Sequence, residues 1–131
     1  MHIKQLRIMA TLLIAFAIGQ AGLGSGILDG VPWIRVAHAT NAFAVVALTM
    51  VATVLGFFHR RAGGPSWVLF LPVGLLLTTL AQMYLGFTGV TSTHVFLGAL
   101  FLSAVTAYCS YAFRLKPSAV TETSRARTTA R

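Results

Sequence analysis

Long apolar stretches separated by short polar links make up most of the chain. A membrane-spanning helix needs about 20 predominantly apolar residues to cross a hydrocarbon core about 30 Å thick. Four stretches reach this length and hold a single charged residue, Arg35, and they cover residues 8–28, 34–58, 67–88 and 93–113. Their unbroken apolar character favours helices over the alternating pattern of barrel strands. We therefore predict an all-α fold.

The links between these stretches are short, so consecutive helices are expected to lie antiparallel as neighbours. We predict an integral membrane four-helix up-down bundle in residues 1–116, followed by a basic tail, residues 117–131, that is flexible unless a partner holds it. The composition agrees with the membrane class, because 56% of the residues are hydrophobic, 9% are charged and the mean hydropathy is +0.80.

The formal net charge of +8 is distributed unevenly along the chain. Nine of the ten basic residues precede the first helix, join the second to the third, or follow the fourth: Lys4, Arg7, Arg60, Arg61, Arg114, Lys116, Arg125, Arg127 and Arg131. An up-down bundle places these segments on one side, which the positive-inside rule makes cytoplasmic. We predict a multi-pass protein of the cell membrane with both termini in the cytoplasm and with contacts to membrane lipid. Because topology explains the charge, nucleic-acid binding is not expected.

A polar pattern occurs twice in the apolar background. "QAGLG" begins at Gln20 and "QMYLG" begins at Gln82, and each is followed, after a loop, by a histidine, His38 and His94. Each copy places Gln and Leu-Gly near the end of one helix and His near the start of the next. The repetition predicts that the bundle consists of two related helical hairpins.

The two histidines are expected to lie at the same depth. His38 precedes Arg60 by 22 residues and His94 precedes Arg114 by 20 residues, so each ring lies about 30 Å from the basic side at about 1.5 Å per residue. In a ring of four helices the second and fourth are diagonal, with axes roughly 14 Å apart when neighbours are 8 to 10 Å apart. Two imidazoles on these helices can face each other across a haem and bind its iron.

Residues near the histidines suit such a group. Ala42 and Gly98 lie one turn further along each helix and keep it narrow there. Arg35, one turn before the first histidine, offers a cation to haem propionates. The alternative is that Arg35 extends to the membrane surface or pairs with Asp29.

The two glutamines have more than one interpretation. Gln20 and Gln82 can hydrogen-bond between helices, support the second nitrogen of a histidine, or bind a ligand directly. Likewise, water or backbone groups can satisfy both histidines without any cofactor. Zn or Cu sites need further His, Cys or carboxylate ligands, of which the chain offers few at this depth.

The segment "QMYLGFTGVTSTHVFLGAL", residues 82–100, resembles the hairpin of the third and fourth helices in one half of haem A synthase. That family has two pseudosymmetric four-helix halves, each of which holds a haem between histidines of its second and fourth helices. The resemblance implies that His38 and His94 are axial ligands of haem b. The chain matches a single half and has no glutamate before His38 of the kind the family uses, so haem A synthase activity is not expected. Small four-helix cytochromes b are similar in architecture.

These observations predict a small cytochrome b-like membrane protein that binds one b-type haem near the outer leaflet. Electron transfer, or a role as accessory subunit of a respiratory or haem-handling complex, is expected rather than an enzymatic activity, because no nucleophile, carboxylate pair or phosphate-binding loop is present. A larger membrane complex or a homo-oligomer would then be its partner. The alternatives are a cofactor-free structural subunit or assembly factor, and a quinone- or lipid-binding module that uses Gln82 and His94.

Overall fold

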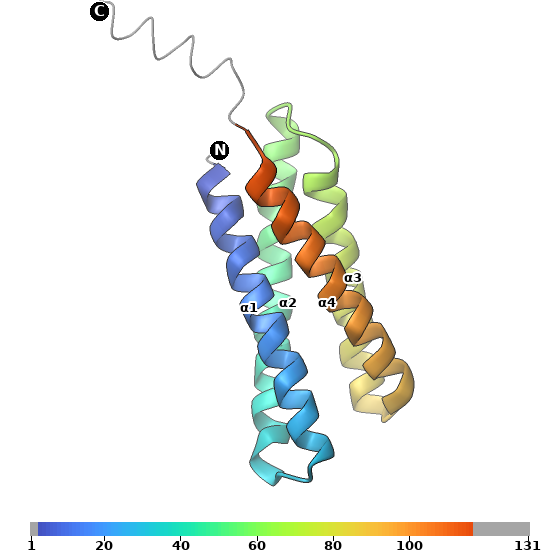
Figure 1. Ribbon diagram of the computed structural model, residues 1–131. Coiled ribbons are helices and arrows are strands. Elements are labelled where there is room, and N and C mark those ends of the chain that lie inside the picture. Colours follow the sequence, from blue (N-terminus) through green and yellow to red (C-terminus); the bar gives the residue numbers. More distant parts are fainter. Residues whose placement is uncertain (1–2, 117–131) are drawn as a thin grey trace, which may run out of the picture.

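The computed structural model describes residues 3–116, and the predicted tail, residues 117–131, lies outside them. The described chain forms four helices and no strand: α1 (Ile3–Leu28), α2 (Pro32–Arg61), α3 (Trp67–Thr88) and α4 (Thr91–Arg114). The helices alternate in direction along one bundle (Figure 1). The predicted all-α, four-helix fold is therefore confirmed.

Three of the helices extend beyond the apolar stretches. The helix α1 begins at Ile3 rather than at residue 8, α2 covers residues 32–61 rather than 34–58, and α4 covers 91–114 rather than 93–113. Only α3 has the predicted bounds. Hydropathy marks the segment that fits the hydrocarbon, whereas backbone hydrogen bonding continues the helix into the polar interface. At the end of α2, basic side chains also interact favourably with the helix dipole.

The three links each contain a glycine with positive φ. Gly30, Gly63 and Gly89 have φ values of 77°, 86° and 74°, in the left-handed region where a residue without Cβ carries no steric penalty. Gly89 ends α3, and its N–H donates to the carbonyl oxygen of Leu85. These glycines allow neighbouring helices to reverse direction within a few residues.

The helices form a ring in which each contacts two neighbours. The helix α1 packs against α2 and α4, and α3 packs against the same two helices. The pairs α1/α3 and α2/α4 are diagonal and make no comparable contact. The predicted diagonal placement of α2 and α4 is therefore confirmed. Neither of the other two helices passes between them.

The closest approach of two helices involves Gly56 of α2. A Cβ at this position would collide with the backbone carbonyl of Val68 in α3. Gly56 is buried, so the absence of a side chain sets the distance between α2 and α3 here.

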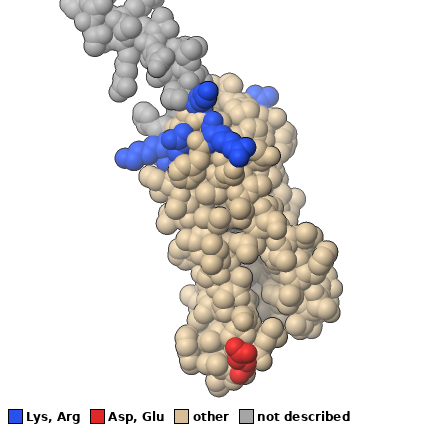
Figure 2. All heavy atoms as spheres, viewed as in Figure 1, with Lys and Arg blue, Asp and Glu red and all other residues tan. Residues whose placement is uncertain are grey.

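The buried core occupies one half of the bundle. We call the end that carries Lys4, Arg7, Arg60, Arg61 and Arg114 the basic end and the opposite end, which carries His38 and His94, the histidine end. All buried residues of the described chain lie in the half nearer the basic end, within residues 6–17, 45–56, 68–79 and 101–112. Towards the histidine end the hairpin of α1 and α2 separates from that of α3 and α4 (Figure 1). Figure 2 shows a hollow between the two hairpins there.

The outer surface of the bundle suits a membrane. All four helices are long and apolar enough to cross one, which is the pattern of a multi-pass membrane protein. Large apolar side chains are exposed along the helices, including Phe43, Leu77 and Phe87. The Lys and Arg side chains visible in Figure 2 gather at the end nearer the N-terminus, while an acidic side chain marks the opposite end.

Candidate functional site

The structure brings the side chains of His38 and His94 together although the backbones of α2 and α4 make no close contact. The centres of the two imidazole rings are 6.1 Å apart, and the ring planes are inclined by 65°. Both residues are partly exposed. They lie on α2 and α4 at the end of the bundle where the hairpins separate, and each ring also contacts the other helix of its own hairpin, α1 for His38 and α3 for His94.

In the first hairpin a glutamine holds the histidine through its side chain. The amide nitrogen of Gln20 lies 3.1 Å from Nε2 of His38. Asn41 Nδ2 donates to Gln20 Oε1 at 2.6 Å and to the carbonyl oxygen of Phe16 at 3.0 Å. Since an amide nitrogen can only donate, Nε2 of His38 accepts, and in the neutral ring the proton is on Nδ1. This Nδ1 is buried without a hydrogen-bond partner.

In the second hairpin the histidine is held through the backbone. Nδ1 of His94 lies 3.0 Å from the carbonyl oxygen of Gln82, and Nε2 of Gln82 donates to the carbonyl oxygen of His94 at 2.9 Å. A carbonyl oxygen only accepts, so the proton of the neutral ring is on Nδ1 and Nε2 is unprotonated. Oε1 of Gln82 is buried without a partner. The interhelical hydrogen bonding expected of both glutamines is therefore present, but the two hairpins achieve it differently.

A glycine lies against each imidazole. A Cβ at Gly24 would lie 3.3 Å from Cε1 of His38, and a Cβ at Gly86 would lie 3.4 Å from Cε1 of His94. Each glycine follows its glutamine by four residues and therefore shares its helix face. The i, i+4 spacing of Gln and Gly in the motif indicates a common helix face, but it does not reveal that the glycines contact the imidazoles. Gly98 has a different role, because a Cβ there would lie 3.3 Å from Nε2 of Gln82.

Unpaired buried polar atoms are concentrated at this site. Three such side-chain atoms occur in the described chain, and two of them, Nδ1 of His38 and Oε1 of Gln82, belong to the histidine–glutamine cluster. The third is the Tyr108 hydroxyl in the core. Leaving a buried donor or acceptor unpaired costs about 1–3 kcal/mol. The site therefore holds one buried donor, which faces Gly24 of α1, and one buried acceptor, and neither has a partner in the described protein.

The remaining predicted residues lie around the cluster. Ala42 is partly buried on α2, one turn from His38 towards the core. Arg35 is exposed one turn from His38 in the other direction. Asp29 is also exposed, and among the described residues no ion pair joins it to Arg35. The side chain of Arg35 is thus exposed at the histidine end without a described ion pair to Asp29.

No group of three or more His, Cys, Asp or Glu side chains with the arrangement of a metal site occurs among residues 3–116. The nitrogen ligands at the histidine end are the two imidazoles.

Comparison of the chain with protein-family models, with curated proteins and with solved structures finds no match. The fold and the site themselves define the class: a four-helix bundle of membrane-length helices with a paired histidine–glutamine site at one end.

Proposed function

We propose that this protein is a small cytochrome b-like membrane protein that binds one b-type haem between α2 and α4, with His38 and His94 as axial ligands. The observation that carries the proposal is the 6.1 Å between the two ring centres. Imidazoles about 2 Å from opposite sides of one metal ion have ring centres about 6 Å apart. Edge-to-face packing of two rings also gives centres about 4.5–7 Å apart, so the visible spectrum has to distinguish a haem-bound pair from a packed pair.

The protonation pattern of the site fits this role. Nε2 of His94 is unprotonated while Nδ1–H is held by a carbonyl oxygen, an arrangement that orients imidazole ligands and raises their basicity. Nε2 of His38 is also unprotonated and accepts from Gln20. Binding of iron at His38 would exchange this hydrogen bond for a metal bond.

The space around the histidines also fits a flat apolar group. Between the core and the histidine end, no described residue is buried. A hollow separates the two hairpins in this region (Figure 2). Small residues, Ala42 and Gly98, border the histidines on the core side, and Arg35 supplies a cation for carboxylates on the other side.

A haem held in this way supplies one-electron transfer, so the protein would act as an electron carrier or as an accessory subunit of a respiratory or haem-handling complex. The residues of the chain would set the reduction potential through the two axial nitrogens, their hydrogen bonds and the apolar surroundings. The exposed apolar faces of the helices leave room for contacts with a larger membrane complex or a second copy.

The visible spectrum of the purified protein tests the proposal. After expression with an ample haem supply, we expect a Soret band, and α and β bands on reduction, with about one haem per chain. A colourless, folded protein under these conditions would contradict the proposal and would favour a cofactor-free structural subunit or assembly factor.

A quinone is the second candidate, because one observation specifically favours it. Nδ1–H of His38 is a buried donor without a partner and faces Gly24, and a quinone carbonyl is an acceptor with an apolar body. Gln82 and His94 would line the same space. Extraction of a quinone from colourless purified protein, and its loss in Gln82→Leu, would support this candidate over haem.

The orientation in the membrane is part of the proposal. We infer that the basic end is cytoplasmic and that both termini lie there, in the cell membrane, because the described cations other than Arg35 are at that end. Exposed serines offer a matched pair of reporters: Ser66 near the basic end and Ser92 at the opposite end. In a Cys109→Ser background, we expect Ser92→Cys to react with a membrane-impermeant maleimide in intact cells and Ser66→Cys to react only after permeabilisation. The reverse pattern would invert the proposed topology.

We also infer that the two hairpins are related by duplication. The inference is supported by the equivalent positions of two glycine–histidine contacts, Gly24 with His38 and Gly86 with His94. The different hydrogen bonds of the two glutamines would then have arisen after the duplication.

A further inference from the structure

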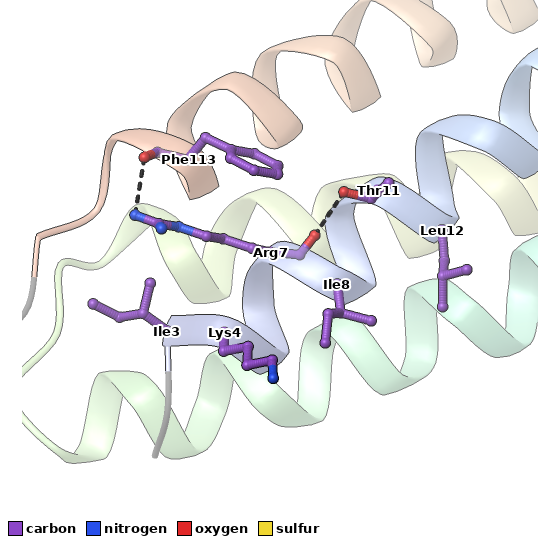
Figure 3. Close-up of a pocket in the computed structure, with 7 residues that line it drawn as sticks. All are labelled: Ile3, Lys4, Arg7, Ile8, Thr11, Leu12 and Phe113. Carbon is purple, nitrogen blue, oxygen red and sulfur yellow. Dashed lines mark hydrogen bonds between the residues drawn. The ribbon is translucent and has the colours of Figure 1, made fainter.

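A groove between α1 and α4 lies at the basic end, far from the histidines. Its volume is about 500 Å³, and Figure 3 shows the residues that line it. Its walls are mostly apolar and include Ile8, Leu12 and Phe113, each between 41% and 53% exposed. Two cations, Lys4 and Arg7, lie at the end of the groove nearer the N-terminus.

Arg7 is fixed in place by the end of α4. Its Nη2 donates to the carbonyl oxygens of Phe113 and Leu115 at 3.1 and 2.9 Å, and its Nε lies 3.4 Å from the carbonyl oxygen of Ala112. Its guanidinium carbon also lies 5.6 Å from the centre of the Phe113 ring. These contacts satisfy carbonyls that a helix end leaves unpaired, and they hold a permanent positive charge at the mouth of the groove.

Lys4 differs from Arg7 because it is exposed and no hydrogen bond or ion pair joins it to another residue of the described chain. The only acidic residue within residues 3–116, Asp29, is at the opposite end of the bundle. The charge at the mouth of the groove is therefore positive and uncompensated by the described protein.

The order of polar and apolar groups along α1 matches the order of groups in a phospholipid. Lys4, Ile8 and Leu12 are spaced by four residues and form one stripe of the helix, about 12 Å long at about 1.5 Å per residue. The cation is at the level of the membrane interface and the apolar part extends inward. A free phosphate would use the cations alone, whereas a lipid uses the whole groove.

We propose that this groove binds one anionic phospholipid, with its phosphate at Lys4 and Arg7 and an acyl chain along Ile8, Leu12 and Phe113. The lipid would join the first and last helices of the bundle across the position where Arg7 already connects them. This proposal is independent of any group bound at the histidine end.

Native mass spectrometry of the full chain in detergent, with dioleoyl phosphatidylglycerol or dioleoyl phosphatidylcholine added, tests the proposal. We expect one phosphatidylglycerol to be retained in preference to phosphatidylcholine. Lys4→Gln is expected to lower this retention about fivefold, the change expected for one cation near an anionic headgroup. Arg60→Gln, which removes a cation at the same end but outside the groove, is the matched control and should leave the retention unchanged.

A second variant tests the apolar part of the groove. Leu12→Trp fills the groove and keeps every charge, and because Leu12 is 41% exposed, the fold should tolerate it, as helical circular dichroism would verify. We expect it to reduce phosphatidylglycerol retention. Equal retention of both lipids, equal losses in Lys4→Gln and Arg60→Gln, or unchanged retention in Leu12→Trp would each overturn the proposal. Displacement of the lipid by millimolar inorganic phosphate would overturn it in favour of a free phosphate ligand.

Discussion

Replacement of either His38 or His94 by alanine is expected to remove the haem spectrum. Each variant loses one of the two proposed axial ligands, and no third His, Cys, Asp or Glu side chain forms a metal-binding group with the pair among the described residues. Loss of a group that merely supports a ligand already lowers metal affinity about 10- to 100-fold, so loss of the ligand itself should lower haem occupancy by at least about tenfold. The Soret absorbance per protein measures this occupancy.

Two further variants make the result specific. His59→Ala removes a histidine near the basic end, next to Gly64, and should leave the spectrum unchanged. His94→Gly opens a space at the ligand position, so added imidazole should restore part of the Soret band. Unchanged spectra in both alanine variants of the pair would exclude these residues as ligands even if the protein binds haem.

The second large effect is expected at Gly56. In Gly56→Ala the new Cβ meets the carbonyl of Val68, and because backbone cannot rotate away as a side chain can, α2 and α3 must move apart. Such overpacking costs about 1–3 kcal/mol, and a clash with backbone belongs to the upper part of this range, so the cost exceeds the gain of about 1 kcal/mol in helix propensity from Gly to Ala. We expect the midpoint of thermal unfolding in detergent to fall by several degrees.

Gly74→Ala is the matched control for this prediction. Gly74 is also a glycine inside a helix, but nothing lies within 4 Å of a Cβ added there. The unfolding midpoint should stay the same or rise, because the higher helix propensity of alanine is then the main contribution to the change in the free energy of unfolding. A midpoint in Gly56→Ala that is as high as in Gly74→Ala would show that α2 and α3 do not need the close approach.

The fold could be predicted from the sequence to the level of helix number, direction and neighbours. Hydropathy over four stretches and short links suffice for this, because both follow from the thickness of a bilayer and the reach of a turn. The helix ends could not be predicted in the same way. Residues such as Lys4 and Arg7 are polar yet helical. The carbonyls at the end of α4 are bonded by Arg7 from the first helix, a contact between distant parts of the sequence that no local pattern contains.

The candidate site could be predicted in its position but not in its details. Helix periodicity was enough to place His38 and His94 at one depth on diagonal helices, and the structure places their rings 6.1 Å apart. Gln20 forms a hydrogen bond with the imidazole of His38, whereas Gln82 donates to the backbone carbonyl of His94. This difference depends on side-chain conformations, which two similar motifs do not reveal. The separation of the hairpins also depends on packing between helices, which hydropathy does not record.

The restriction of the buried core to the half nearer the basic end has a consequence for local dynamics. Segments that bury few apolar groups open at low free-energy cost, so amide protons within residues 20–28 and 82–88 should exchange with solvent faster than those within 45–56 and 101–112. A ligand that bridges α2 and α4 at the histidine end would hold the two hairpins together, and with them the segments of α1 and α3 packed against these helices, without disturbing the core. Hydrogen exchange would then report occupancy of the site as a slowing confined to one end of the molecule.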